Sequence, residues 1–272
     1  MLEVFQYEFM NRAFLVGIFT AVCTAMLGNF VVTARQSVVS DMLAHTALVG
    51  VGLGIFFKVS PTYFAMLSTI AAALLLWWLS RKKDQAPEAI SMLLLTGGLA
   101  TALLLAHLQK DNPIALSTYL FGSILTVTDD EMWVFICLSL VIVAVLIFFW
   151  RQFLTLVFDH DFLKTQQNAV FYEILFMLLV ALVVAIGLKI VGGLLIGALL
   201  VIPVLIAQSF GKSFKQNVIL SVIVNMISVI IGIFASFYLD VPASSGIVLS
   251  IIFLYILVKT FAFFVAGFSN SH

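Results

Sequence analysis

Long apolar runs alternate with short polar segments along the whole chain, and this pattern predicts membrane-spanning helices. A helix needs roughly 20 mostly apolar residues to cross the ~30 Å hydrocarbon core of a bilayer. Nine runs have about that length, and we place them at residues 13–33, 38–57, 62–80, 89–108, 132–150, 171–188, 191–210, 217–238 and 244–265. The sequence therefore predicts an all-α, polytopic helical membrane protein.

The separation between the sixth and seventh runs is weak. The segment 187–193, GLKIVGG, offers little polar sequence for a loop. Eight and nine transmembrane helices are therefore both consistent with the pattern. The longest expected loops, 109–131 and 151–170, are too short for a soluble domain, so residues 1–272 are expected to form a single transmembrane domain.

Composition supports this class. The chain is 63% hydrophobic and only 10% charged, whereas soluble domains carry about 25% charged residues. Its formal net charge is zero, so composition does not indicate a nucleic-acid partner. Cys23 and Cys137 both lie within apolar runs, where they are expected to be small packing residues.

The distribution of Lys and Arg predicts the orientation, because cytoplasmic loops carry more of them. With nine spans and the N-terminus outside, the inner loops hold eight of these residues: Arg35, Arg81, Lys82, Lys83, Arg151, Lys164, Lys212 and Lys215. The outer segments hold four: Arg12, Lys58, Lys110 and Lys189. This bias favours an external N-terminus and a cytosolic C-terminus.

Asp41 and His45, inside the second apolar run, are the strongest candidates for chemistry. They are four residues apart and therefore share one helix face. A carboxylate within a membrane helix costs about 2.5–3.5 kcal/mol on insertion scales, so it usually faces a bundle interior or a wet cavity. His45 follows Arg35 by ten residues, or roughly 15 Å of helix, which is near the membrane midplane. The pair could bind zinc or manganese, relay protons or ions, or bond a neighbouring helix.

Three other positions leave alternatives open. Asp240 precedes Pro242, which should end the eighth run, so this carboxylate is either a loop residue or a ligand at the outer mouth. Pro203 lies deep in the seventh run and predicts a kink, a hinge or a carbonyl facing the pathway. His160 stands between Asp159 and Asp161, as either a metal ligand or part of a solvated helix start.

Enzyme signatures are weak. Gly211-Lys212-Ser213 resembles the end of a phosphate-binding loop, but Ile206 occupies the position that requires the first glycine. The sequence also lacks an HExxH motif for a membrane metalloprotease. A non-enzymatic transporter is expected, either powered by a partner ATPase or coupled to an ion gradient through Asp41.

Four blocks, in this order and spacing, resemble the permease subunits of bacterial ABC importers for zinc and manganese. They are Arg35-Gln36-Ser37 followed by Ser40-Asp41-Met42-Leu43-Ala44-His45; Tyr119-Leu120-Phe121-Gly122; Val191-Gly192-Gly193-Leu194-Leu195 with Ile202-Pro203; and Asp240-Val241-Pro242-Ala243. The family pattern often has Gly where this chain has Ser40 and Ala where it has Thr46, and both changes leave the Asp–His pair intact.

The resemblance implies a permease domain in the bacterial inner or plasma membrane, acting as a homodimer or paired core. It also implies two cytosolic ATPase subunits and an extracytoplasmic metal-binding protein. Zn²⁺, or alternatively Mn²⁺, is expected as the transported substrate, with no permanently bound cofactor. In the family the motif residues matching Asp41 and His45 line the metal path.

The same resemblance assigns the loop after the fifth run to a short coupling helix that docks on the ATPase. Its residues here are Asp159, Asp161, Phe162, Leu163 and Lys164. Phe162 and Leu163, apolar within a polar loop, are the expected docking side chains. The family commonly has a glycine after this helix, where this chain has Gln167 and Asn168.

Overall fold

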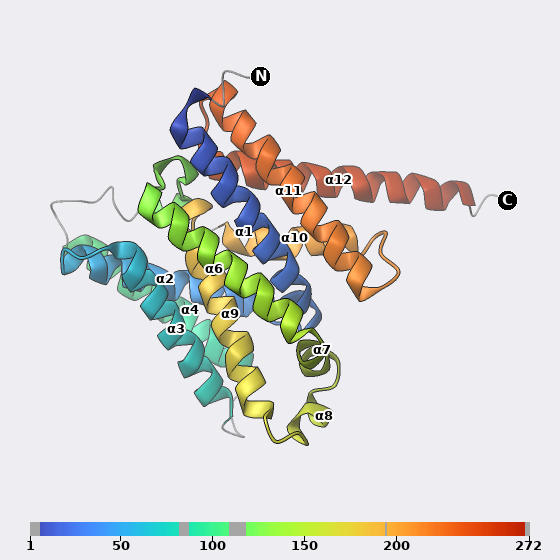
Figure 1. Ribbon diagram of the computed structural model, residues 1–272, viewed down its shortest axis with the longest axis horizontal. Coiled ribbons are helices and arrows are strands. Elements are labelled where there is room, and N and C mark those ends of the chain that lie inside the picture. Colours follow the sequence, from blue (N-terminus) through green and yellow to red (C-terminus); the bar gives the residue numbers. More distant parts are fainter. Residues whose placement is uncertain (1–5, 82–86, 109–117, 194, 270–272) are drawn as a thin grey trace.

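The computed structural model describes residues 6–81, 87–108, 118–193 and 195–269, so Lys82, Lys83, Lys110 and Leu194 lie outside the described residues. Within these ranges the regular structure is helical (Figure 1). The helices are α1 (Glu8–Thr33), α2 (Ser37–Phe56), α3 (Pro61–Ser80), α4 (Pro87–Leu108), η2 (Ile124–Thr126), α6 (Asp129–Phe148), α7 (Trp150–Phe158), α8 (His160–Lys164), α9 (Ala169–Ile190), α10 (Ile196–Ala207), α11 (Phe214–Leu239) and α12 (Ala243–Ser269).

Among the described residues, eight helices are long and apolar enough to cross a membrane. They are α1, α2, α3, α4, α6, α9, α11 and α12. Their bounds match eight of the nine predicted runs to within a few residues. The all-α membrane class is therefore confirmed, since the length of each apolar run sets the length of its helix.

Ion pairs and aromatic contacts define the two ends of the bundle. Arg12 of α1 pairs with Asp129 of α6 at 3.1 Å, and Lys189 of α9 pairs with Glu131 of α6 at 3.1 Å. The starts of α1 and α6 therefore share an end with the last turn of α9, which we term the N-terminal end. At the other end, termed the α8 end, Phe214 of α11 stacks on Phe158 at 5.8 Å between ring centroids. Figure 1 shows the N-terminus and α8 at opposite ends.

The seventh run, predicted as a continuous span over residues 191–210, is instead a broken segment. α9 reaches the N-terminal end and α11 starts at the α8 end, so the chain between them must return across the bundle. Among the described residues of this stretch only α10 is helical, and its 12 residues extend about 18 Å, less than the ~30 Å hydrocarbon thickness. The prediction of a full-length helix at this position is wrong, because hydropathy does not distinguish apolar helix from apolar loop.

The non-helical part of this crossing is held by residues 119–123, where a short helical stretch gives way to irregular backbone. The Gly193 amide donates to the carbonyl of Tyr119 at 3.0 Å, and the Ser123 amide donates to that of Lys189 at 3.0 Å. Gly122 and Gly192 have φ angles of 71° and 95°, and a Cβ on either would overlap the facing backbone. Backbone outside a helix is tolerated at membrane depth only where protein groups satisfy it, as they do here.

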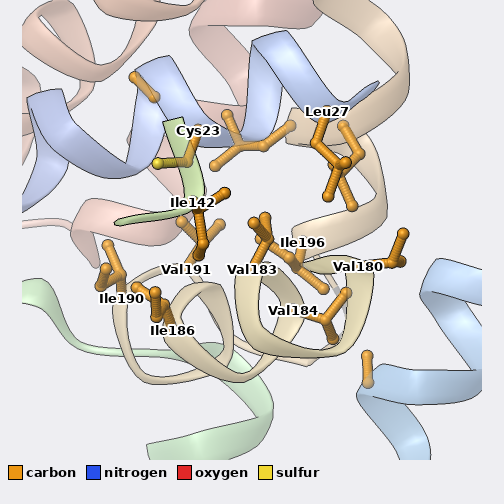
Figure 2. Close-up of a cluster of buried hydrophobic side chains, with 14 of the residues drawn as sticks. Cys23, Leu27, Ile142, Val180, Val183, Val184, Ile186, Ile190, Val191 and Ile196 are labelled. Carbon is orange, nitrogen blue, oxygen red and sulfur yellow. The ribbon is translucent and has the colours of Figure 1, made fainter. Parts of the chain in front are cut away.

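Buried aliphatic side chains fix the junction between α9 and α10. Figure 2 shows side chains from α1, α6, α9 and α10 converging on one cluster. Ile196 of α10 is fully buried and Val183 of α9 is 1% exposed. The broken crossing is therefore packed into the core of the bundle rather than laid on its surface.

Candidate functional site

Asp41 and His45 lie in the first half of α2, on the side of the helix that is left open. Asp41 is exposed and His45 is half-buried, whereas the intervening Met42, Leu43 and Ala44 are all fully buried. The 3.6-residue period of the helix puts the carboxylate and the imidazole on the same side. An exposed carboxylate within a spanning helix indicates a surface that a cavity or another subunit covers in the membrane.

The first turn of α10 faces this pair. A Cβ built on Gly197 would overlap Oδ1 of Asp41, so glycine at this position lets the carboxylate keep its present orientation. Helix N-termini carry unpaired amide groups and partial positive charge, which favours a nearby anion. The break before α10 thus places the start of a helix beside the exposed carboxylate of Asp41.

His45 carries an unsatisfied polar group. Its Nδ1 is buried and has no hydrogen-bond partner in the described part of the protein. Buried polar side-chain atoms are usually paired with protein or water, so an orphan calls for a specific explanation. An imidazole nitrogen next to a carboxylate is a suitable donor for a divalent transition metal.

One copy of the chain does not complete a metal site. The described residues contain no group of three or more His, Cys, Asp and Glu side chains that could hold a metal ion. A surface cavity at the α8 end is lined by Arg151, Lys215 and their neighbours, and it includes neither Asp41 nor His45. The Asp159-His160-Asp161 run likewise makes no such group within the described residues.

Asp240 lies at the C-terminal end of α11. It adopts a left-handed conformation with φ of 53° and is exposed. Its neighbourhood is at the N-terminal end of the bundle, because Phe237 contacts Tyr7 at 5.9 Å between ring centroids. A hydrogen bond from Ser236 Oγ to the Val241 carbonyl, 2.7 Å long, closes the turn toward α12. Asp240 and α8 are thus at opposite ends of the bundle.

The predicted coupling segment forms α8. Asp159 caps this short helix by accepting a hydrogen bond from the Phe162 amide at 3.0 Å, and Asp161 pairs with Lys164 at 3.4 Å. Phe162 is 55% exposed, but Leu163 is fully buried. Leu163 therefore cannot be an outward docking side chain as expected, because it packs inward and anchors α8 to the bundle.

Sequence reasoning missed a contact network next to α8. Glu173 of α9 bonds both His160 and Trp77, the latter 96 residues away along the chain. The sequence does contain a signal for this network: Glu173 is a lone carboxylate in the first turns of an apolar helix, where a charged side chain needs a partner.

The described residues form eight helices long and apolar enough to span a membrane, a broken ninth crossing, and an acid–imidazole pair facing that break. Together these features define a polytopic membrane transport protein. The chain belongs to the ABC 3 transport family, whose model matches residues 6–262.

Similar proteins cover nearly the same length. The chain is 31% identical to the high-affinity zinc uptake system membrane protein ZnuB of Buchnera aphidicola subsp. Schizaphis graminum, over 89% of this chain and 94% of that one. It is 24% identical to the manganese transport system membrane protein MntC of Listeria monocytogenes, over 96% and 90% of the two chains. Its fold is similar to a chain of PsaBC from Streptococcus pneumoniae, solved in complex with Fab, with a TM-score of 0.83, 24% identity and coverage of 94% and 92%.

Proposed function

We propose that this chain is the membrane-spanning subunit of an ABC importer for a divalent metal, zinc in the first place, and that Asp41 and His45 line the ion path. The observation that carries the proposal is the open Asp41–His45 face of α2 opposite the first turn of α10. A carboxylate, an imidazole and a helix break inside one bundle are the features that transporters use at ion sites.

Zinc is favoured over manganese by two arguments. The zinc-uptake relative is more similar in sequence than the manganese-transport relative. An imidazole donor also suits zinc, whereas manganese favours a shell of oxygen ligands. Manganese remains the second candidate substrate, supported by the similarity to MntC over most of both chains.

A second copy of the chain is part of the proposal. Zinc sites commonly have four ligands, and one chain offers two at this position. Two copies facing each other across Asp41 and His45 would supply two carboxylates and two imidazoles. The exposure of Asp41 in the single chain is consistent with a partner covering this face.

Two further partners follow from the family and from the ends of the bundle. The energy would come from a separate cytosolic ATPase subunit that docks at α8, with Asp159, Asp161 and Lys164 shaping the helix and Phe162 projecting from it. An extracytoplasmic metal-binding protein would deliver the ion at the opposite end, where Asp240 forms part of the outer mouth.

Metal uptake by point variants tests the proposal. In cells lacking their own permease, Asp41→Asn and His45→Gln should each abolish uptake of radioactive zinc at unchanged membrane levels. Asp130→Asn is the matched control, because Asp130 is an exposed carboxylate in the first turn of α6. Near-normal uptake by both site variants would refute the assignment.

The energy source is tested separately. The purified complex, reconstituted in liposomes, should transport zinc only when ATP is present on the side of the membrane where the ATPase subunit lies. Uptake driven by a proton gradient without ATP would instead support an ion-coupled carrier that uses Asp41 as its proton site. Competition between zinc and manganese in the same liposomes ranks the two substrates.

A further inference from the structure

Glu173 bridges two separate elements at the α8 end of the bundle. Its Oε1 lies 3.0 Å from Nε2 of His160, the first residue of α8. Its Oε2 accepts a hydrogen bond of 3.0 Å from the indole Nε1 of Trp77, near the end of α3. One carboxylate thus joins α8, α9 and α3, with a separate oxygen for each partner.

The Glu173 carboxylate is partly sheltered from water, whereas its partner His160 is half exposed. The Glu173 side chain is 16% exposed, compared with 49% for His160. The guanidinium carbon of Arg81 lies over the Trp77 ring, 4.9 Å from its centre, which supports the ring in its orientation. Hydrogen bonds to a carboxylate are stronger than those between neutral groups, and partial burial protects the bond from Trp77 in particular from competition by water.

Its position in the packing gives the bridge a mechanical role. α3 packs along α9 and, more extensively, along α2, the helix that carries Asp41 and His45. Gly50 of α2 allows this close approach, since a Cβ there would overlap the backbone of Phe64 on α3. A displacement of α8 therefore has a continuous route through Glu173 and Trp77 to α3, and from α3 to α2.

We propose that Glu173 is a positioning residue that couples movement of α8 to the ion pathway through its bonds to His160 and Trp77. The proposal rests on the proposed function, because it takes α8 as the helix that docks on the ATPase. Leu163 of α8 is fully buried, and such non-directional apolar burial does not by itself fix the position of α8 along its neighbours. The Glu173 bridge adds directional bonds that hold α8 and α3 in one register.

The test measures metal transported per ATP hydrolysed by the full complex in liposomes. Trp77→Phe removes the indole donor and keeps an aromatic ring, and Glu173→Ala removes both bonds. Each variant should still assemble with the ATPase and hydrolyse ATP, while the transport ratio falls at least about fivefold, the lower range of typical coupling energies. Glu173→Gln, which can accept from Trp77 and donate to His160, should retain most of the wild-type ratio.

Controls separate coupling from stability and from the proposed function itself. Trp133→Phe changes an exposed tryptophan on α6 and should leave the ratio unchanged. Adding Trp77→Phe to Glu173→Ala should cause little further loss of the transport ratio, because both changes remove the same link.

A wild-type ratio in Trp77→Phe and Glu173→Ala would overturn the proposal, and so would equal losses in Glu173→Gln and Glu173→Ala. If Glu173→Ala does not assemble, Trp77→Phe alone decides. Failure of the wild-type complex to transport metal would instead count against the proposed function.

Discussion

The side-chain amide of Asn225 on α11 lies 3.5 Å from the Leu199 carbonyl on α10 and is directed toward it. Pro203, four residues after Leu199, has no N–H to donate to that carbonyl. Asn225 is fully buried and also bonds Thr24 of α1 at 2.8 Å. The amide also donates to the Ala21 carbonyl of α1 at 3.0 Å. These two shorter bonds use both of its hydrogens, so the Leu199 carbonyl is a weak third acceptor, and the amide ties α1 to α11 beside the broken crossing.

Replacing Asn225 by Leu should lower the free energy of unfolding by about 1–3 kcal/mol, because buried acceptors lose their donor. Pro203→Ala restores a helical N–H for the Leu199 carbonyl. The double variant should therefore lose less than the sum of the two single losses. Unfolding of the wild type, the two single variants and the double variant in detergent measures this double-mutant cycle. Strictly additive losses would show that Asn225 and Pro203 act independently.

Gly197→Ala should impair transport with little effect on stability. The added methyl group would overlap Oδ1 of Asp41, and this side chain can rotate away without moving the backbone. We expect zinc uptake to fall by roughly tenfold, equivalent to about 1.4 kcal/mol of lost ion binding. Gly97→Ala on α4 is the control, since a Cβ there has no atom within 4 Å. Normal uptake by Gly197→Ala would indicate that Asp41 does not need its present position.

Phe162 and Leu163 should respond differently to the same change. Phe162→Asp places a charge on an exposed site, so the protein should fold normally and lose affinity for the ATPase by about 30-fold, as expected when a contact worth about 2 kcal/mol is removed. Leu163→Asp buries a charge and should destabilise the permease itself by several kcal/mol. Co-purification and thermal unfolding distinguish the two effects. An undiminished affinity in Phe162→Asp would place the docking surface elsewhere.

Asp240→Cys should react with a membrane-impermeant thiol reagent on intact cells, because Asp240 is exposed at the N-terminal end of the bundle. Cys23 and Cys137 are replaced in the protein used for this test, because both are free thiols that could react with the reagent. Thr165→Cys, directly after α8, should react only after the membrane is permeabilised. Reaction at position 165 in intact cells and at position 240 only after permeabilisation would reverse the predicted topology. If zinc slows labelling at position 240, Asp240 would be assigned as a ligand of the ion.

Local features of the sequence were sufficient for the helices and for part of the site. The apolar runs located all eight long helices to within a few residues, since each spanning helix satisfies its own backbone. The spacing of Asp41 and His45 was enough to place both on one side of α2. The chemistry of the pair as a metal path stays a prediction.

Contacts between distant segments decided the rest. Hydropathy gave the same signal for the irregular residues 191–193 as for α10, because both are apolar, and only the pairing with Tyr119 and Ser123 explains why the helix stops. The burial of Leu163 likewise depends on the contacts that α8 makes with α7 and α9.

The sequence by itself determined the eight long apolar helices of the described structure and which residues share a helix face, because these properties depend on neighbours along the chain. The tertiary structure alone decided that Gly197 and the start of α10 face Asp41 and that Glu173 joins His160 to Trp77. These relationships depend on how helices pack across distances of many residues, and the local period of apolar residues carries no information about which helices meet.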